Sequence, residues 1–208
     1  MIFRHLCSLV ILSAILLNAC KPVDQSSSGT PAQKIAKPQV YVANYPLKYF
    51  AERLGGDAVE VKFPAPADED PAFWQPDDAA ISAYQSADLI LMNGATYSKW
   101  AEKVTLPESK LVDTSAGFKA QYIEIKADST HSHGPGGEHS HSGTAFTTWI
   151  DFIQAIQQFE TVSVALQELV SKEDAEQIKS RMVLLKAELE SFNQRLLACG
   201  SRLVNAPL

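Results

Sequence analysis

Four of the five histidines lie in one short segment, residues 128–144, and they are the side chains of this sequence best suited to hold a metal ion. They form two pairs, His131 with His133 and His139 with His141, and each pair has one residue between its histidines. Neutral imidazole is a good ligand for Zn²⁺ and other borderline cations. The Gly-Pro-Gly-Gly run between the pairs predicts a loop, in which ordering the side chains costs entropy, so we expect weak metal capture. The alternative is a solvated polar loop that binds no metal.

A second group of candidate ligands is acidic. Asp68, Glu69 and Asp70 follow one another in a proline-rich loop, after a strand that we predict over residues 58–63. Parallel α/β sheets bind their ligands at the carboxyl ends of the strands, which is where this loop would lie. The loop therefore predicts a cation site that uses Glu69 and Asp70. A solvated acidic loop is an equally good interpretation of the composition alone.

Other kinds of chemistry are excluded by composition and spacing. The formal net charge is −6 and there is no basic cluster, so we expect no nucleic-acid partner. The only histidines outside the first few residues lie in the predicted loop, where a general base cannot be oriented for a catalytic triad. Neither of the glycine-rich motifs that bind nucleotide phosphates occurs. The sequence therefore predicts a binding protein and not an enzyme.

The first residues predict export and lipidation. Arg4 precedes an apolar run over residues 6–17, which is too short to span a bilayer and is typical of a signal peptide. The run ends in Leu-Asn-Ala-Cys, and this ending predicts attachment of lipid to Cys20 followed by cleavage before it. Several acyl chains would anchor the protein stably outside the plasma membrane, in the periplasmic or extracytoplasmic part of the cell envelope. An ordinary cleaved signal peptide is the alternative.

The elements that must position the candidate ligands alternate between strand and helix. Short apolar runs predict strands over 40–43, 58–63, 87–93 and 110–112, and helical spacing predicts helices over 45–55 and 77–86. This alternation predicts an α/β fold with a parallel sheet and helices on both of its faces. Two helices follow, over about 151–170 and from Ser171 onward. The second carries an apolar stripe whose spacing alternates between four and three residues, and we expect this stripe to face a partner element: Ile178, Met182, Leu185, Leu189, Phe192 and Leu196.

Two stretches of the sequence resemble the zinc/manganese solute-binding proteins of ABC importers. The first, residues 63–93, is a proline-rich loop followed by an acidic helix start, a helix and an Ala-Asp-Leu strand. The second, residues 147–151, is Thr-Thr-Trp-Ile-Asp and comes directly after the histidine-rich segment. The resemblance implies two α/β lobes joined by one long helix, with the metal bound between the lobes. This chain, over residues 39–208, is similar to the first lobe and the connecting helix only, so the second lobe is missing from it.

The same resemblance implies where the metal ligands lie. Family members have a histidine in each stretch, whereas this sequence has Asp70, beside Glu69, in the first and Thr147 in the second. Carboxylates bind hard and borderline cations, but a threonine hydroxyl is a poor ligand for Zn²⁺. The implied cargo is Zn²⁺ or Mn²⁺, bound weakly, and the implied partner is the ABC permease of the importer. The implied metal-site residues are Glu69, Asp70, His131, His133, His139, His141 and Thr147.

The chain is thus predicted to have four parts: a signal peptide over 1–19, a flexible tether over 20–38, a metal-binding lobe over 39–170 and a long linker helix over 171–204. The predicted function is capture of a divalent metal outside the membrane for an uptake system. The alternative function is a structural or interaction lipoprotein, or a gene fragment, that retains only the first lobe.

Overall fold

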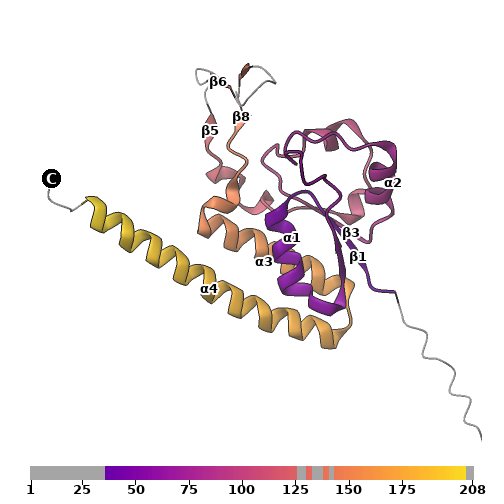
Figure 1. Ribbon diagram of the computed structural model, residues 1–208. Helices are drawn as coiled ribbons and strands as arrows, with labels where there is room; N and C mark the ends of the chain where they lie inside the picture. Colours follow the sequence, from indigo (N-terminus) through magenta and orange to yellow (C-terminus); the bar gives the residue numbers. More distant parts are fainter. Residues whose placement is uncertain (1–35, 126–129, 133–137, 141–142, 205–208) are drawn as a thin grey trace, which may run out of the picture. The chain divides into compact units, whose positions relative to one another are not determined.

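The computed structural model describes residues 36–204 except for 126–129, 133–137 and 141–142 (Figure 1). The predicted signal peptide, the predicted lipidation site Cys20 and most of the predicted tether lie outside the described residues. None of the helices in the described ranges is both long and apolar enough to cross a membrane.

A sheet of four parallel strands forms the centre of the fold. The strands are β1 (Gln39–Val42), β2 (Glu60–Lys62), β3 (Leu89–Met92) and β4 (Leu111–Asp113), and they lie side by side in the order β2-β1-β3-β4. In the register of the two central strands, Val40 lies opposite Leu89 and Val42 opposite Leu91. All three strand pairings are parallel, as the alternation of strands and helices predicts.

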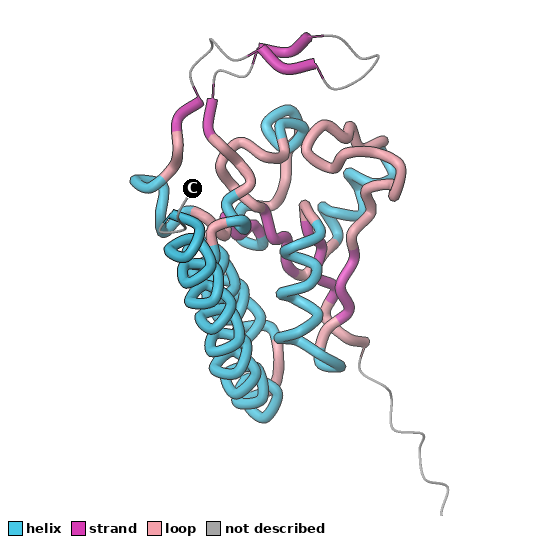
Figure 2. Tube along the Cα trace, turned by 60° about the vertical axis from the view of Figure 1, so that its left-hand side comes forward, coloured by secondary structure: helices cyan, strands magenta, loops and turns pink. Residues whose placement is uncertain are grey.

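Helices cover both faces of the sheet. Alternate residues of the central strands point to opposite faces, so Val42 and Leu91 join one apolar cluster while Ile90 and Met92 join another. The first cluster lies under α1 (Tyr45–Gly55), α3 (Phe152–Leu169) and α4 (Lys172–Val204), and the second lies under α2 (Asp78–Ser86) and the loops around it. Figure 2 shows α3 and α4 running beside each other with α1 next to them. The predicted α/β fold class is confirmed.

Side chains at the starts of the helices fix where they begin. Asn44, Asp77 and Asp151 each accept a hydrogen bond from a backbone N–H in the first turn of α1, α2 and α3, respectively. At the start of α4, Ser171 Oγ accepts from Asp174 N at 3.2 Å and donates to the Asp174 carboxylate at 2.7 Å. These caps satisfy N–H groups that have no partner within a helix.

The remaining elements are short. The 3-10 helices are η1 (Gly56–Ala58), η2 (Lys99–Lys103), η3 (Glu108–Lys110), η4 (Ala116–Gln121) and η6 (Thr148–Ile150). Two antiparallel pairs stand apart from the main sheet: β5 (Glu124–Ile125) with β8 (Gly143–Thr144), and β6 (Thr130–Ser132) with β7 (Glu138–Ser140).

The apolar stripe of α4 is covered along only part of its length. Ile178 and Leu185 are fully buried against α1 and α3, and Met182 and Leu189 pack at the edge of the same cluster. Farther along, the ring of Phe192 stacks on that of Phe152, the first residue of α3, and Leu196 is 58% exposed. The predicted stripe therefore has its partner inside the fold up to Phe192, where α3 begins, and no described residue buries it beyond that point.

Candidate metal-binding edge of the sheet

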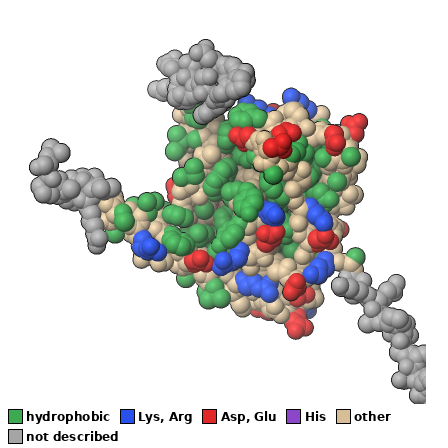
Figure 3. Space-filling model, in the orientation of Figure 1, with side chains coloured by type: hydrophobic (Ala, Val, Ile, Leu, Met, Phe, Trp, Pro, Cys, Tyr) green, Lys and Arg blue, Asp and Glu red, His purple; other side chains and the backbone are tan. Residues whose placement is uncertain are grey.

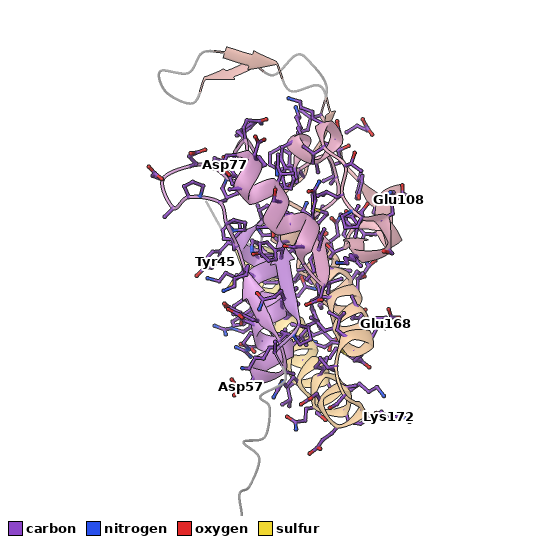
Figure 4. All side chains as sticks on the ribbon, turned by 90° about the vertical axis from the view of Figure 1, so that its right-hand side faces the viewer. Tyr45, Asp57, Asp77, Glu108, Glu168 and Lys172 are labelled. Atoms are coloured by element: carbon purple, nitrogen blue, oxygen red, sulfur yellow. The ribbon has the colours of Figure 1, made fainter. Side chains whose placement is uncertain are left out.

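The carboxyl ends of three of the four parallel strands carry buried polar side chains. Asn44 follows β1, Asn93 follows β3 and Thr114 follows β4, and each is about 1% exposed. Asn44 Nδ2 donates to Asn93 Oδ1 at 3.0 Å, and Thr114 Oγ1 donates to the carbonyl oxygen of Met92 at 2.9 Å. In Figure 4, Tyr45 and Asp77, at the starts of α1 and α2, lie toward this end of the sheet, whereas Asp57 and Lys172 lie at the other end.

Gln158 of α3 joins these strand ends into one network. Its side-chain Nε2 donates to Asn93 Oδ1 at 3.2 Å and to Thr114 Oγ1 at 3.0 Å, and its Oε1 accepts from Thr148 Oγ1 at 3.0 Å. Asn93 Nδ2 also donates to the carbonyl oxygen of Phe146 at 2.9 Å. Buried polar groups are costly to leave unpaired, so this network holds residues 146–148 tightly against the sheet. Thr147, a candidate ligand, lies in the middle of that segment and is exposed.

The acidic loop presents its carboxylates to solvent on a fixed backbone. The side chains of Glu69 and Asp70 are exposed. Asp70 Oδ1 accepts from the backbone N–H of Ala72 at 3.0 Å, and the carbonyl oxygen of Asp70 accepts from the N–H groups of Phe73 and Trp74, both at 2.9 Å. The loop therefore holds the backbone of Asp70 in a turn while leaving carboxylate oxygen accessible to a cation.

Aromatic rings anchor this loop to the segment that follows β3. Trp74 is buried, and its ring lies 6.2 Å from that of Trp100 in η2, centroid to centroid. Trp100 in turn packs on Tyr84 of α2, with centroids 4.9 Å apart. Burial of these large rings fixes the position of the acidic loop relative to the sheet.

A second set of rings joins the acidic loop to the segment that carries Thr147. Phe73, three residues after Asp70, has its ring 6.5 Å from that of Phe146, which directly precedes Thr147. Between the two loops, the Tyr97 ring lies 5.3 Å from Phe146 and 5.7 Å from Trp149. The rings thus bring the loops of Asp70 and Thr147 to the same edge of the sheet, as expected for two contributions to one site.

The histidine-rich segment contains more regular structure than its composition predicts. His131 in β6 and His139 in β7 lie opposite each other in the register of an antiparallel pair, whereas a loop without strands was expected. A Gly- and Pro-rich run between two short strands favours such a chain reversal. His133 and His141 lie outside the described residues, so their role as ligands stays a prediction.

Within the ranges that the structure describes, no three His, Cys, Asp or Glu side chains are grouped closely enough to hold a metal ion. The structure adds residues that sequence reasoning missed, namely Asn93, Tyr97 and Gln158. The sequence could have identified Asn93, because a polar residue directly after a continuous apolar strand lies at the carboxyl end of that strand, where ligands bind. Gln158 interrupts the apolar face of a helix, which is unusual unless its amide finds a buried partner.

Comparison with known proteins gives a family and a fold. The family model described as "ZnuA: Zinc-uptake complex component A periplasmic" matches residues 40–203. A search of curated proteins gives no significant match.

Solved structures match over about three quarters of the chain. A crystal structure of ZnuA is 24% identical with a TM-score of 0.62, and the match covers 77% of this chain and 57% of that one. FpvC from Pseudomonas aeruginosa, in complex with Mn²⁺, is 17% identical with a TM-score of 0.61, covering 78% and 56%. The metal-dependent lipoprotein YcdH from Bacillus subtilis is 17% identical with a TM-score of 0.58, covering 76% and 54%. These likenesses show the fold, and the chain spans little more than half the length of these relatives.

Proposed function

Because the chain belongs to the family of periplasmic zinc-uptake component A proteins, we propose that it binds a divalent cation outside the membrane and passes it to an ABC permease. The cation that we propose is Zn²⁺ or Mn²⁺. Proteins of this family bind a metal ion and do not catalyse a reaction. The chemistry required is therefore only the exchange of ligands around the ion.

One structural observation supports this proposal above the others: the acidic loop and the Thr147 segment meet at the carboxyl edge of a parallel sheet. This edge is where open α/β sheets bind their ligands. Glu69 and Asp70 supply exposed carboxylates there, and oxygen ligands of this kind suit Mn²⁺ and other hard cations. His131, His133, His139 and His141 would add imidazole nitrogens, which suit Zn²⁺, and Thr147 would add a weak hydroxyl ligand.

We further propose that the protein is held at the membrane by lipid on Cys20. The sequence that ends at Cys20 supports this anchor, and the similar protein YcdH is a lipoprotein. An anchor outside the membrane would keep the cation-binding edge near the permease at a high effective concentration.

The test is calorimetry of the full chain, purified in mild detergent and freed of metal by a chelator, with Zn²⁺ and Mn²⁺ as separate titrants. We expect micromolar or weaker binding, because no described cluster supplies three strong ligands and the histidine side chains must be ordered on binding. Changing the four loop histidines together to Ala should abolish Zn²⁺ binding. Nanomolar binding that survives this change would contradict the assignment of the ligands.

An interaction function is favoured by a separate observation. Phe192 and Leu196 are 41% and 58% exposed, and Figure 3 shows hydrophobic side chains along this end of α4. A chain that takes up neither cation but associates through this face would be an interaction lipoprotein. Equilibrium sedimentation of the same samples separates the two functions.

A further inference from the structure

Tyr97 lies between the two loops that carry the candidate metal ligands. It is 5% exposed, and its ring makes edge contacts with the rings of Phe146 and Trp149, on either side of Thr147. Tyr97 lies in the short segment between β3 and η2. Trp100 in η2 packs on Trp74 of the acidic loop. Tyr97 is therefore packed against one loop and joined to the other through its own segment.

The turn that delivers Tyr97 to this place is strained. Gly94, Ala95 and Thr96 all have positive φ, at 73°, 49° and 60°, and the Tyr97 N–H closes the turn by donating to the Gly94 carbonyl oxygen at 3.0 Å. A left-handed conformation is unfavourable for residues other than glycine, and it is especially unusual for a β-branched residue such as threonine.

Glycine is required at the first position of this turn. A Cβ on Gly94 would lie 2.0 Å from Asp113 Oδ1 and 2.1 Å from Ser115 Oγ. Strained backbone persists where the surrounding structure imposes it, and such strain gathers at functional sites. Here its effect is to place the phenol of Tyr97 at the candidate metal-binding edge.

The hydroxyl group of Tyr97 is available for a function. In the described part of the chain no residue forms a hydrogen bond with it, and although most of the side chain is buried, the hydroxyl oxygen is not itself fully buried. Burial and, to a smaller extent, the negative charge of Asp70 together raise the pKa of Tyr97 to about 12. The phenol therefore keeps its proton at any physiological pH and can donate a hydrogen bond. Its ring contacts Phe146, whose ring in turn contacts Phe73 of the acidic loop, three residues after Asp70.

We propose that Tyr97 is a positioning residue of the metal site, whose O–H donates to the Asp70 carboxylate when that carboxylate binds the cation. One oxygen of Asp70 is already turned toward the Ala72 N–H, so a donor on the phenol would fix the orientation of the whole carboxylate. Ligating carboxylates are commonly held in this way by outer hydrogen bonds, and loss of such a partner weakens metal binding 10- to 100-fold. This inference rests on the proposed cation binding.

The test is the Tyr97→Phe variant, which removes the hydroxyl and keeps the ring contacts. We expect the dissociation constant of the full chain for Mn²⁺, and separately for Zn²⁺, to rise about 10-fold or more, with an unchanged melting temperature. Because the hydroxyl acts through Asp70, Tyr97→Phe should add no further weakening to the Asp70→Ala variant. Tyr49→Phe, which removes a hydroxyl on the exposed side of α1, is the matched control and should change binding less than twofold.

The outcomes separate this inference from the proposed function. Wild-type protein that binds neither cation would overturn both. Wild-type protein that binds, with Tyr97→Phe within twofold of it, would overturn only the role of Tyr97. Equal weakening by Tyr97→Phe in the wild-type and Asp70→Ala backgrounds would also overturn it, because the hydroxyl would then act independently of Asp70.

Discussion

The two loops that meet at the carboxyl edge of the sheet are held there by different forces. The acidic loop, with Asp70, is anchored by the buried ring of Trp74 on Trp100. The segment with Thr147 is tied to the strand ends by directional hydrogen bonds that converge on Asn93 and Gln158. The acidic loop is therefore anchored by apolar packing, whereas the Thr147 segment has a buried polar network in addition to the ring contacts of Phe146 and Trp149 with Tyr97.

This difference determines how each loop responds to a bound ion. Apolar contacts vary gradually with distance, so a loop held by rings tolerates small shifts of its backbone. A buried amide that loses a partner is left unsatisfied, so a loop held by such a network has one well-defined position. We expect Asp70 to adjust to a cation and the Thr147 segment to stay in place.

The largest loss of stability is expected from Trp74→Ala, which removes the buried ring that holds the acidic loop against Trp100. Deleting a buried indole leaves a cavity against Trp100 and costs about 3–5 kcal/mol of the free energy of unfolding. Urea denaturation measures this loss. The backbone amides of residues 73 and 74 donate to the Asp70 carbonyl oxygen, so their hydrogen exchange measures the local opening of the acidic loop. Phe73→Ala is the control, since that ring is 51% exposed and its removal should cost less. Equal costs for the two variants would show that the loop is not anchored by Trp74.

A smaller loss of stability, confined to the Thr147 segment, is expected from Gln158→Leu. Leucine keeps the volume but leaves the Thr148 hydroxyl without its acceptor and Asn93 with one donor fewer, at a cost of about 2–3 kcal/mol. Exchange of the Ile150 amide, which donates to Thr147, should accelerate, while the amides of the acidic loop stay protected.

Gln157→Leu is the neighbouring control for this substitution, because Gln157 is only partly buried and lies outside the network. If Gln158→Leu accelerated amide exchange equally in both loops, the acidic loop and the Thr147 segment would open as one cooperative unit. The proposed difference between how they are held would then be wrong.

The scaffold of these loops was predictable because its signals are local. The continuous apolar run before Asn93 predicts a strand buried on both faces, and β3 is such a strand. The spacing of Leu47, Phe50 and Leu54, followed by two glycines, predicts the helix over 45–55 that the structure contains.

The contacts at the edge were not predictable because they join distant residues. Gln158 and Asn93 are 65 positions apart, and no pattern in either neighbourhood specifies the other. The left-handed turn at Ala95 and Thr96 contradicts the local preferences of both residues, so only the folded structure reveals it. In the same way, the spacing of apolar residues on α4 predicted which face of the helix is apolar. It did not predict that this face is buried by the rest of the fold only as far as Phe192.

The smallest effect is expected at Tyr97, whose ring contacts the Thr147 segment and whose pKa is raised by the charge of Asp70 in the acidic loop. Burial, as the larger cause, and the charge of the Asp70 carboxylate together raise the pKa of Tyr97 from 10 to about 12. Asp70→Asn removes the charge and leaves the burial, so the pKa of Tyr97 should fall but stay above 10. Because the unfolded chain releases this proton first, stability contributed by Tyr97 is complete below pH 10 and is lost as the pH rises toward 12.

Phenolate absorbance during alkaline titration measures this shift, with the Tyr97→Phe spectrum subtracted to isolate one of the six tyrosines. Asp77→Asn, at the start of α2, is the control: asparagine still caps the helix, and Asp77 is not among the groups that shift the pKa of Tyr97. A Tyr97 pKa that Asp70→Asn leaves unchanged would mean that the charge of the acidic loop does not reach the phenol. The two loops would then be joined by ring packing alone, and a cation bound at Asp70 would have no polar connection to the network that holds Thr147.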